Sequence, residues 1–263
     1  QQNLHPASDI SGDSIENYYV MYNRGYEYFR QSIICSKTGN GTIEPVVFYT
    51  YAPERACNGV NWADIAAYAD WAGLRPITEL EYEKACRGTA KPVVGEYAWG
   101  TTNIGRVDCF SGPDGSGYEI KIPTTGLVNC CYEGGIAPYH KKEWKTPKNP
   151  GFEGPVSCGL FSMTRHDGVP VRENDGATFY GIMEMSGNLW EPLITIGHPK
   201  GRAFTGVHGD GSLDDAGYAN VPDWPDSSGA GAGIRGATWQ SDPKYLTLAM
   251  REVANFPSSA RRY

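Results

Sequence analysis

The sequence predicts a globular, loop-rich fold in which short helices and short strands are joined by long connections. The 263 residues include 33 glycines and 18 prolines, a content that favours turns over long regular elements. Two adjacent stretches between residues 61 and 88 carry helix patterns with complete end signals. Several short runs elsewhere are rich in aromatic and β-branched residues, as strands are. A chain of this length can bury a sizeable core as one large domain or two small ones.

Composition and charge argue against two kinds of partner. The net charge of -7 and the absence of a Lys/Arg run disfavour nucleic acid. No apolar run approaches the roughly 20 residues of a membrane-spanning helix. The 17 tyrosines and 7 tryptophans suit either an exposed recognition surface or an aromatic-rich core. Because the chain begins at Gln1, with neither Met nor a signal peptide, we interpret it as a processed or trimmed product.

The seven cysteines bear on the cellular compartment. They form no C-x-x-C pair and no Cys/His cluster with zinc spacing, so a structural zinc site is not expected. We interpret the chain as exported, with one or two disulfides in the region from Cys109 to Cys158. Cys130 and Cys131 are adjacent, and a vicinal disulfide is strained, so we expect separate partners or free thiols for them.

The first 60 residues carry two strand patterns. Residues 18–21 and 45–51 are rich in aromatic and β-branched side chains, and residues 37–42 between them are typical of a turn. The triplet Asn40-Gly41-Thr42 is also a glycosylation sequon, which matters only in a host that modifies it.

A first helix is predicted after residue 60. Asn61 can cap it, and its apolar residues follow the i, i+3, i+4, i+7 spacing of one helix face. Gly73 is expected to end the helix. The predicted inner face comprises Trp62, Ile65, Ala66, Ala69 and Ala72.

A second helix follows within a few residues. It opens with a capping box, in which Thr78 and Glu81 satisfy each other's backbone donors. Acidic residues occupy its first turn, whereas Lys84 and Arg87 lie in its last turn, an arrangement that matches the helix dipole. Gly88 is expected to end it.

The remaining chain is predicted to be mostly loop. Residues 96–181 and 199–233 show no sustained periodicity, and short strands are expected over 234–239 and 246–253. Residues 231–236 fit the dinucleotide-binding pattern G-x-G-x-x-G, yet no strand precedes them and no helix pattern follows, so we reject that interpretation. The five histidines show no H-x-x-x-H spacing, and we expect no catalytic role for them.

Residues 181–191 are the strongest candidate for a metal site. Glu184 and Glu191 lie seven residues apart around a Gly-Asn turn. A hard cation such as Ca²⁺ prefers carboxylate and backbone carbonyl oxygens on a tightly bent loop, and Gly187 permits such a bend. The alternative is an ordinary surface turn with two solvated glutamates, which composition alone favours.

Three stretches together resemble the formylglycine-generating enzyme family, also called the sulfatase-modifying-factor domain. The sequence G-L-R-P-I-T-E-L-E-Y-E-K-A-C-R-G at residues 73–88, followed by Y-A-W-G at 97–100, is similar to its R-L-P-T-E-x-E-W-E-x-A-x-R-G and P-W-G. G-I-M-E-M-S-G-N-L-W-E at residues 181–191 resembles its G-x-x-D-M-x-G-N-V-W-E-W. Residues 233–251 are similar to its R-G-G-S-W and the strand after it, which ends in Arg. The matching segments cover somewhat under half of the chain.

The resemblance implies that the whole chain is one α+β domain that lacks the family's terminal strands. Its core would be C-type-lectin-like, loop-rich, with two helices packed on small twisted antiparallel sheets. A structural Ca²⁺ is also implied, held by the side chains of Glu184 and Glu191 and the carbonyl oxygens of Gly187 and Leu189. Glu184 replaces the family's usual Asp or Asn, and Asn129 matches the Asn ligand of a second calcium site.

One departure from the family decides the expected activity. The family's oxidase chemistry depends on two cysteines, five residues apart, that bind copper and meet the substrate cysteine. Alignment places Ser241 and Leu246 at these positions, and neither side chain can replace a soft thiolate ligand. No cysteine follows Cys158 in the chain. The resemblance therefore implies a domain without the family's activity.

We predict a non-catalytic, exported structural or binding domain at the cell surface, as part of a fibre, an adhesin, or a gliding or secretion apparatus. Residues 193–197 and 202–206 resemble surface proteins of Bacteroidetes-like bacteria. The expected partners are proteins or further copies of the chain, with carbohydrate as a further candidate. One alternative is a formylglycine-type oxidase or a related iron-dependent oxygenase, for which the sequence offers no metal-ligand set.

A second alternative is a ligand-binding protein diversified by a retroelement, because such proteins share this fold and vary near the C-terminus. For Trp239 and Arg251 we prefer an explanation as strand packing or a solvated face. The candidate binding surface comprises Trp239, Gln240, Lys244, Tyr245, Arg251 and Asn255.

Overall fold

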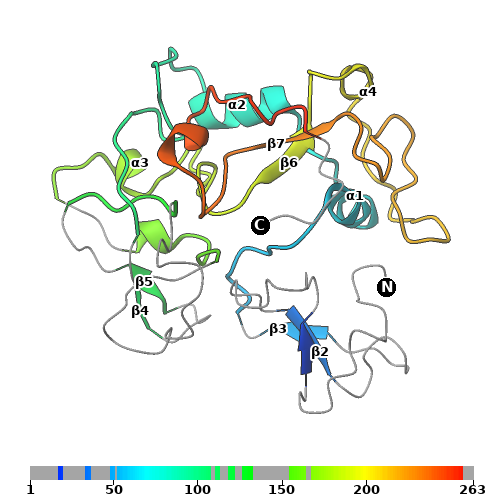
Figure 1. Ribbon diagram of the computed structural model, residues 1–263, viewed down its shortest axis with the longest axis horizontal. Coiled ribbons are helices and arrows are strands. Elements are labelled where there is room, and N and C mark those ends of the chain that lie inside the picture. Colours follow the sequence, from blue (N-terminus) through cyan, green and yellow to red (C-terminus); the bar gives the residue numbers. More distant parts are fainter. Residues whose placement is uncertain are drawn as a thin grey trace.

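The computed structural model describes residues 17–19, 33–36, 48–50, 52–107, 110–112, 118–121, 126–132, 154–163 and 167–256 (Figure 1). Its elements are β1 (Asn17–Tyr19), β2 (Ile33–Ser36), β3 (Phe48–Thr50), α1 (Trp62–Trp71), α2 (Glu79–Arg87), β4 (Phe110–Ser111), β5 (Ile120–Lys121), η2 (Leu160–Ser162), α3 (Val171–Asn174), β6 (Glu191–Ile194), α4 (Pro199–Arg202), β7 (Ala232–Arg235) and η3 (Pro243–Leu246). Short helices and short antiparallel strands in long loops make this an α+β fold, as expected.

The first three strands form an antiparallel sheet in the order β1-β2-β3. The predicted strands at 18–21 and 45–51 are confirmed in part, as β1 and β3. Strand β2 was not predicted, although Ile33 and Ile34 are β-branched residues that favour strands. The glycosylation sequon lies outside the described residues.

Helix α1 begins directly after Asn61, the residue predicted to cap it. The side chain of Asn61 accepts a hydrogen bond from the Asp64 amide at 2.9 Å, and the Asp64 carboxylate accepts one from the Asn61 amide at 3.0 Å. Trp62, Ala66 and Ala69 are buried as expected. The remaining two residues of the predicted inner face, Ile65 and Ala72, are half-buried.

Helix α2 has the predicted capping box and the predicted end. The Thr78 hydroxyl accepts from the Glu81 amide at 3.2 Å, and the Glu81 carboxylate accepts from the Thr78 amide at 2.9 Å. Gly88 ends the helix with a φ of 63°, and Lys84 donates to its carbonyl oxygen at 3.2 Å. None of the described helices has the length and hydropathy that a bilayer crossing requires.

Strands β6 and β7 form a two-stranded antiparallel sheet with a helix on each face (Figure 1). Successive residues of a strand point to opposite faces. Leu193 accordingly packs with Tyr82 of α2, whereas Ile194 packs with Trp62 of α1. All four of these side chains are buried. The sheet therefore joins two apolar clusters, one under each helix.

A buried ion-pair network lies at the start of α2. The Glu79 carboxylate binds Arg235 of β7 at 2.7 Å and Arg251 at 2.8 Å. The same carboxylate accepts from the Thr195 hydroxyl and the Ile196 amide, each at 3.3 Å. Arg235 also donates to the Leu248 carbonyl oxygen. This network connects α2, the end of β6, β7 and the C-terminal segment.

The residues after β7 differ from the prediction. Instead of a strand over 246–253, the structure has the 3-10 helix η3 followed by turns. Asp242 caps η3 by accepting from the Lys244 amide at 3.0 Å, and Pro243 occupies its first position. A proline that cannot donate and a capping aspartate both favour a helical turn over a strand here.

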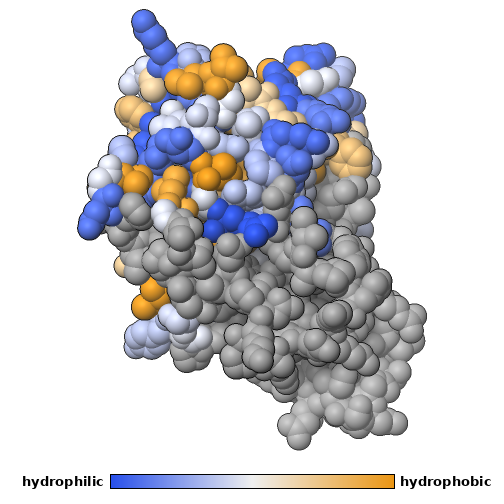
Figure 2. Space-filling view, turned by 60° about the vertical axis from the view of Figure 1, so that its left-hand side comes forward, coloured by the Kyte–Doolittle hydropathy of each residue, from blue (hydrophilic) through white to orange (hydrophobic). Residues whose placement is uncertain are grey.

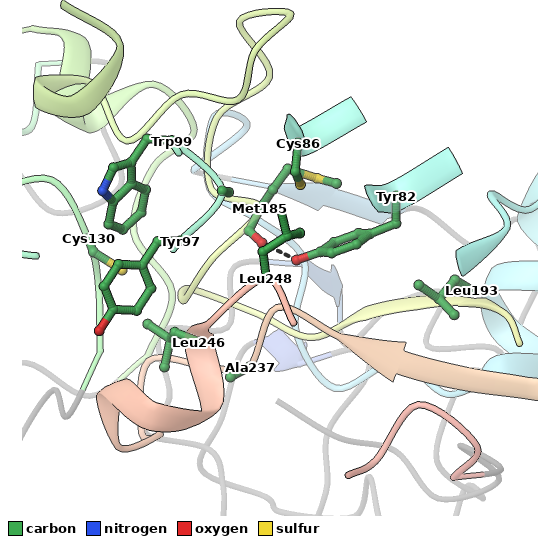
Figure 3. Close-up of a cluster of buried hydrophobic side chains, with 11 residues drawn as sticks. Tyr82, Cys86, Tyr97, Trp99, Cys130, Met185, Leu193, Ala237, Leu246 and Leu248 are labelled. Carbon is green, nitrogen blue, oxygen red and sulfur yellow. Dashed lines mark hydrogen bonds between the residues drawn. The ribbon is translucent and has the colours of Figure 1, made fainter. Parts of the chain in front are cut away.

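The cysteines disagree with the expected disulfides. None of Cys130, Cys131 and Cys158 forms a disulfide, so the prediction was wrong for these three residues, and Cys109 lies outside the described part of the chain. The side chains of the adjacent Cys130 and Cys131 pack in different apolar clusters. Cys130 belongs to the cluster under α2 (Figure 3). Cys131 belongs to a further cluster around Trp239. The two adjacent cysteines therefore form no vicinal disulfide, as expected.

Candidate functional site

The stretch 184–188 is a tightly bent loop. Glu184, Gly187 and Asn188 all have positive φ, at 62°, 83° and 65°. Gly187 donates to the Gly236 carbonyl oxygen at 2.8 Å, which fixes the loop beside the end of β7. A Cβ on Gly187 would also collide with the Cys131 carbonyl oxygen, so the chain can pass here only as glycine.

Two buried side chains of this loop hold distant segments in place. The Ser186 hydroxyl accepts from the Ala98 amide at 3.1 Å and donates to the Leu246 carbonyl oxygen at 2.9 Å. The Asn188 side chain accepts from the Val156 amide at 2.9 Å. The loop is therefore part of the core, and the alternative of an ordinary solvated turn is wrong.

Glu184 reaches a neighbouring loop rather than solvent. Its carboxylate accepts from the Gly159 amide at 2.8 Å and is hydrogen-bonded to the Cys158 thiol. Burial raises the pKa of Glu184 to about 7, although these two hydrogen bonds oppose the shift. Burial and the nearby negative charge of Glu184 raise the pKa of the Cys158 thiol to about 11.

Glu191 is a buried carboxylate with an unsatisfied oxygen. Its Oε2 atom accepts no hydrogen bond from any described residue. Burial raises the pKa of Glu191 well above its ordinary value, and the charge of Glu184 raises it further. A Cβ on Gly236 would overlap Glu191 Oε2, so this carboxylate lies directly against the end of β7.

These features fit the hard cation expected from the sequence. Two carboxylates close enough to affect each other's charge, one with an oxygen that lacks a donor, are the kind of oxygen ligands that a hard cation prefers. The hydrogen bonds of the described loop leave the carbonyl oxygens of Gly187 and Leu189 unused. Across the described ranges, no three His, Cys, Asp or Glu side chains gather as a metal site, so backbone oxygens would have to complete the coordination.

Asn129 does not join the two glutamates. Its side-chain oxygen accepts from the Gly105 amide at 2.9 Å, and its side-chain nitrogen donates to the Glu173 carbonyl oxygen at 2.8 Å. Asn129 thus links the 105 segment to α3 as a buried bridge. These contacts give no support to its predicted role as a ligand of a second calcium.

The two positions that carry cysteines in the family that this chain resembles are occupied here by side chains engaged in hydrogen bonds or core packing. Ser241 lies in a turn, where its hydroxyl accepts from the Thr238 amide at 3.0 Å and lies 3.3 Å from the Thr238 hydroxyl. Leu246 is completely buried, in the same cluster as Tyr97 and Cys130 (Figure 3). Neither side chain offers a free soft ligand.

Comparison with known proteins settles the family. Residues 16–262 match the sulfatase-modifying factor enzyme 1-like domain. The chain belongs to this family. It is also 27% identical, over 194 residues, to a mouse (Mus musculus) protein named "Inactive C-alpha-formylglycine-generating enzyme 2". That alignment covers 70% of the chain and 49% of the mouse protein, so the chain spans about half the length of this curated relative.

The C-terminal residues of the sulfatase-modifying factor domain do not form the predicted ligand surface as a whole. Trp239 is buried in the core, so it presents no surface to a ligand, and Arg251 pairs with Glu79. Lys244 lies 4.8 Å from the centre of the Tyr245 ring. Gln240 is half-buried and Asn255 is exposed. The packing explanation is thus confirmed for Trp239, whereas binding by the other residues stays a prediction.

Sequence reasoning missed the partners that position the two glutamates. Gly159 lies 25 residues before Glu184, and Gly236 lies 45 residues after Glu191. No local pattern indicates such contacts. Ser186 gave no signal either, because a serine beside Gly-Asn is ordinary turn composition, whereas here its hydroxyl is buried and used twice.

Proposed function

We propose that this sulfatase-modifying factor domain is a non-catalytic structural or binding domain. The observation that carries the proposal is Leu246, which fills the core where the family's chemistry needs a thiol. Ser241, at the other position, uses its hydroxyl to stabilise its own turn. The mouse relative is named as an inactive protein, which is consistent with the same conclusion.

A formylglycine assay tests the absence of catalysis. The full chain, supplied with copper and oxygen, would be incubated with a cysteine-bearing peptide, and mass spectrometry would look for the aldehyde product. A catalytically active family member, treated identically, is the positive control. We expect no product above the level without protein. Aldehyde formation with turnover would overturn the proposal.

We further propose that the domain has a C-type-lectin-like core stabilised by calcium. Glu184 and Glu191 would supply carboxylate oxygens, and Gly187 and Leu189 would supply backbone oxygens. Bound Ca²⁺ would neutralise two buried negative charges beside the β6–β7 sheet. The unsatisfied oxygen of Glu191 supports this assignment, since a native structure seldom leaves a buried carboxylate oxygen without a donor or cation.

Thermal unfolding in calcium and in chelator tests the metal. We expect calcium to raise the melting temperature of the wild type, and Glu191→Gln to abolish that increase. Glu54→Gln, which changes an exposed glutamate on another loop, is the matched control and should keep the increase. Isothermal titration would give the stoichiometry. An equal response of both variants to calcium would refute the site.

We propose that the domain acts outside the cell, where it binds or assembles with proteins as part of a surface fibre, an adhesin, or a gliding or secretion apparatus. The free thiols remove the support that disulfides would have given to export. What supports export is the resemblance of residues 193–197 and 202–206 to surface proteins. Mass spectrometry of protein recovered from the native host's outer surface would test this location, and recovery only from inside the cell would refute it.

A further inference from the structure

A group of large apolar side chains lies exposed on α1 and on the loop that packs beside its end. Tyr68 and Trp71 are 63% and 64% exposed, and their ring centres lie 6.2 Å apart on the outer side of α1. Leu74 follows the helix, and Val207 and Leu213 lie in the loop. The loop runs beside α1 in Figure 1, in yellow to orange. Figure 2 shows that apolar residues on another face, where it is not grey, form separate small patches.

A buried aspartate holds the loop against the helix. Asp70 of α1 is completely buried, and its carboxylate accepts from the amides of Asp210 and Asn220, each at 3.0 Å. The backbone adds two hydrogen bonds, from Gly209 to Leu74 at 2.7 Å and from Gly211 to Asp70 at 3.0 Å. The exposed apolar side chains therefore sit on a surface that is organised before any partner binds, which lowers the entropic cost of binding.

The same loop is strongly acidic. Residues 203–234 contain five aspartates and neither Lys nor Arg. Asp226 pairs with Lys200 at 2.7 Å. The exposed carboxylates of Asp210 and Asp214 accept only nearby backbone amides, and Asp215 is exposed as well. No ion pair with any of these three is found among the described residues. Their negative charge is available to a partner.

We propose that this surface docks an arginine-bearing, apolar segment of a protein partner. We define the acidic aromatic face by its members, Tyr68, Trp71, Leu74, Val207, Leu213, Asp210, Asp214 and Asp215. A guanidinium can stack on an aromatic ring or bind a carboxylate, so an arginine-bearing segment suits both kinds of side chain on the face. The three aliphatic residues favour an apolar peptide over a sugar. The inference deepens the proposed binding role and depends on it.

A defined peptide tests the proposal on the full chain. The probe is a fluorescent peptide of repeated Arg-Leu-Gly triplets, and a Lys-Leu-Gly peptide of equal length is its comparison. Fluorescence anisotropy at physiological salt gives the affinity. We expect the arginine peptide to bind several-fold more tightly than the lysine peptide. Trp71→Ala should weaken binding by about tenfold, as loss of a central aromatic contact commonly does.

Matched variants distinguish specific binding at the acidic aromatic face from nonspecific attraction to the protein's net negative charge. Asp214→Asn combined with Asp215→Asn should weaken binding several-fold, whereas Glu54→Gln combined with Glu252→Gln, which removes the same charge elsewhere, should leave it within about twofold. Tyr180→Ala removes an exposed aromatic outside the face and should also leave it unchanged. Unaltered melting temperatures would show that Trp71→Ala and the Asp variants fold.

Several outcomes would overturn the inference. These are no binding of the arginine peptide, equal affinity for both peptides, equal losses in the charge-matched controls, or full affinity in Trp71→Ala. Trp71-dependent binding of glycans on an array, or Trp71-dependent self-association in ultracentrifugation, without peptide binding, would assign the face to another occupant. The proposed absence of catalysis is tested separately by the aldehyde assay, so failure of one does not decide the other.

Discussion

The two ends of β6 each meet a buried carboxylate, but its charge is compensated differently at each end. Glu79, beside the residues that follow β6, is bound by the guanidinium groups of Arg235 and Arg251. Glu191, which begins β6, has an oxygen without a donor, and Glu184 adds a second negative charge nearby. A buried charge must be paired or neutralised. The chain itself pairs the first carboxylate, whereas the calcium proposed above would neutralise the second.

The largest expected effect is the loss of the internal pairing. Glu79→Gln removes the nearest counter-charge of the buried Arg235, so we expect the free energy of unfolding to fall by about 3–5 kcal/mol. Urea denaturation would measure the change. Glu83→Gln is the matched control, because Glu83 is a more distant partner of Arg235, at 3.4 Å, and is partly exposed. It should cost under about 1 kcal/mol. Equal costs would show that burial of the pair is not what matters.

Gly236→Ala tests the close approach at the other carboxylate. The new methyl group would overlap Glu191, and Gly236 has a φ of 82°. We expect a loss of about 2–3 kcal/mol in the free energy of unfolding, together with loss of the calcium response. Gly181→Ala is the control, because Gly181 has a φ of 83° but open space around it. It should cost about 1 kcal/mol from backbone strain alone. Similar losses in both would contradict the described packing.

Glu191→Gln should act in the opposite direction from Glu79→Gln. In chelator the substitution removes the cost of burying a carboxyl group whose pKa is raised well above its ordinary value, so the free energy of unfolding should rise by about 1–2 kcal/mol. In calcium the wild type should gain about 2.7 kcal/mol at a concentration 100 times the dissociation constant, and the variant should gain nothing. Denaturation curves in both buffers would show whether the variant is the more stable protein in chelator and the wild type the more stable one in calcium. A variant that is less stable in chelator would argue that Glu191 is already compensated by the protein.

The smallest effect concerns a similar ion pair at the surface. The Arg75 guanidinium lowers the pKa of Glu81 to about 2, from an ordinary value of 4.5. The folded state therefore gains stability above pH 4.5 and loses it as the pH falls toward 2. Because the Glu81 side chain is 42% exposed, solvent screening should limit the contribution to about 1 kcal/mol or less. Stability measured between pH 5 and pH 2.5, with Glu81→Gln as reference, would check this limit.

The helices were predictable because their signals are local. Asn61 with Asp64 and Thr78 with Glu81 lie three residues apart, and the structure confirms both capping boxes. The β6–β7 sheet was predicted only in part, since a pairing such as Glu191 with Arg235 spans 44 residues of mostly loop. Strand propensity alone also failed after β7, where Pro243 and its capping aspartate favour a helical turn.

Only the part of the candidate site that lies within the motif at residues 181–191 was predictable from the sequence. The motif placed Glu184 and Glu191 around one bent loop, and the structure has Glu184 in that loop and Glu191 at the start of β6. It could not indicate that Glu184 would meet Gly159 or that Gly236 would lie against Glu191, because those contacts depend on how separate loops pack. The ion pair of Arg251 with Glu79 was missed for the same reason, since 172 residues separate the two.

Leu246 also bears on whether the family's thiol pair could be introduced by substitution. A thiol at this buried position would be smaller than the leucine and would leave a cavity, and a large-to-small change in a core commonly costs about 2–5 kcal/mol. A thiol at Leu246 would thus lower the stability of the protein before a second thiol at Ser241 could complete the pair.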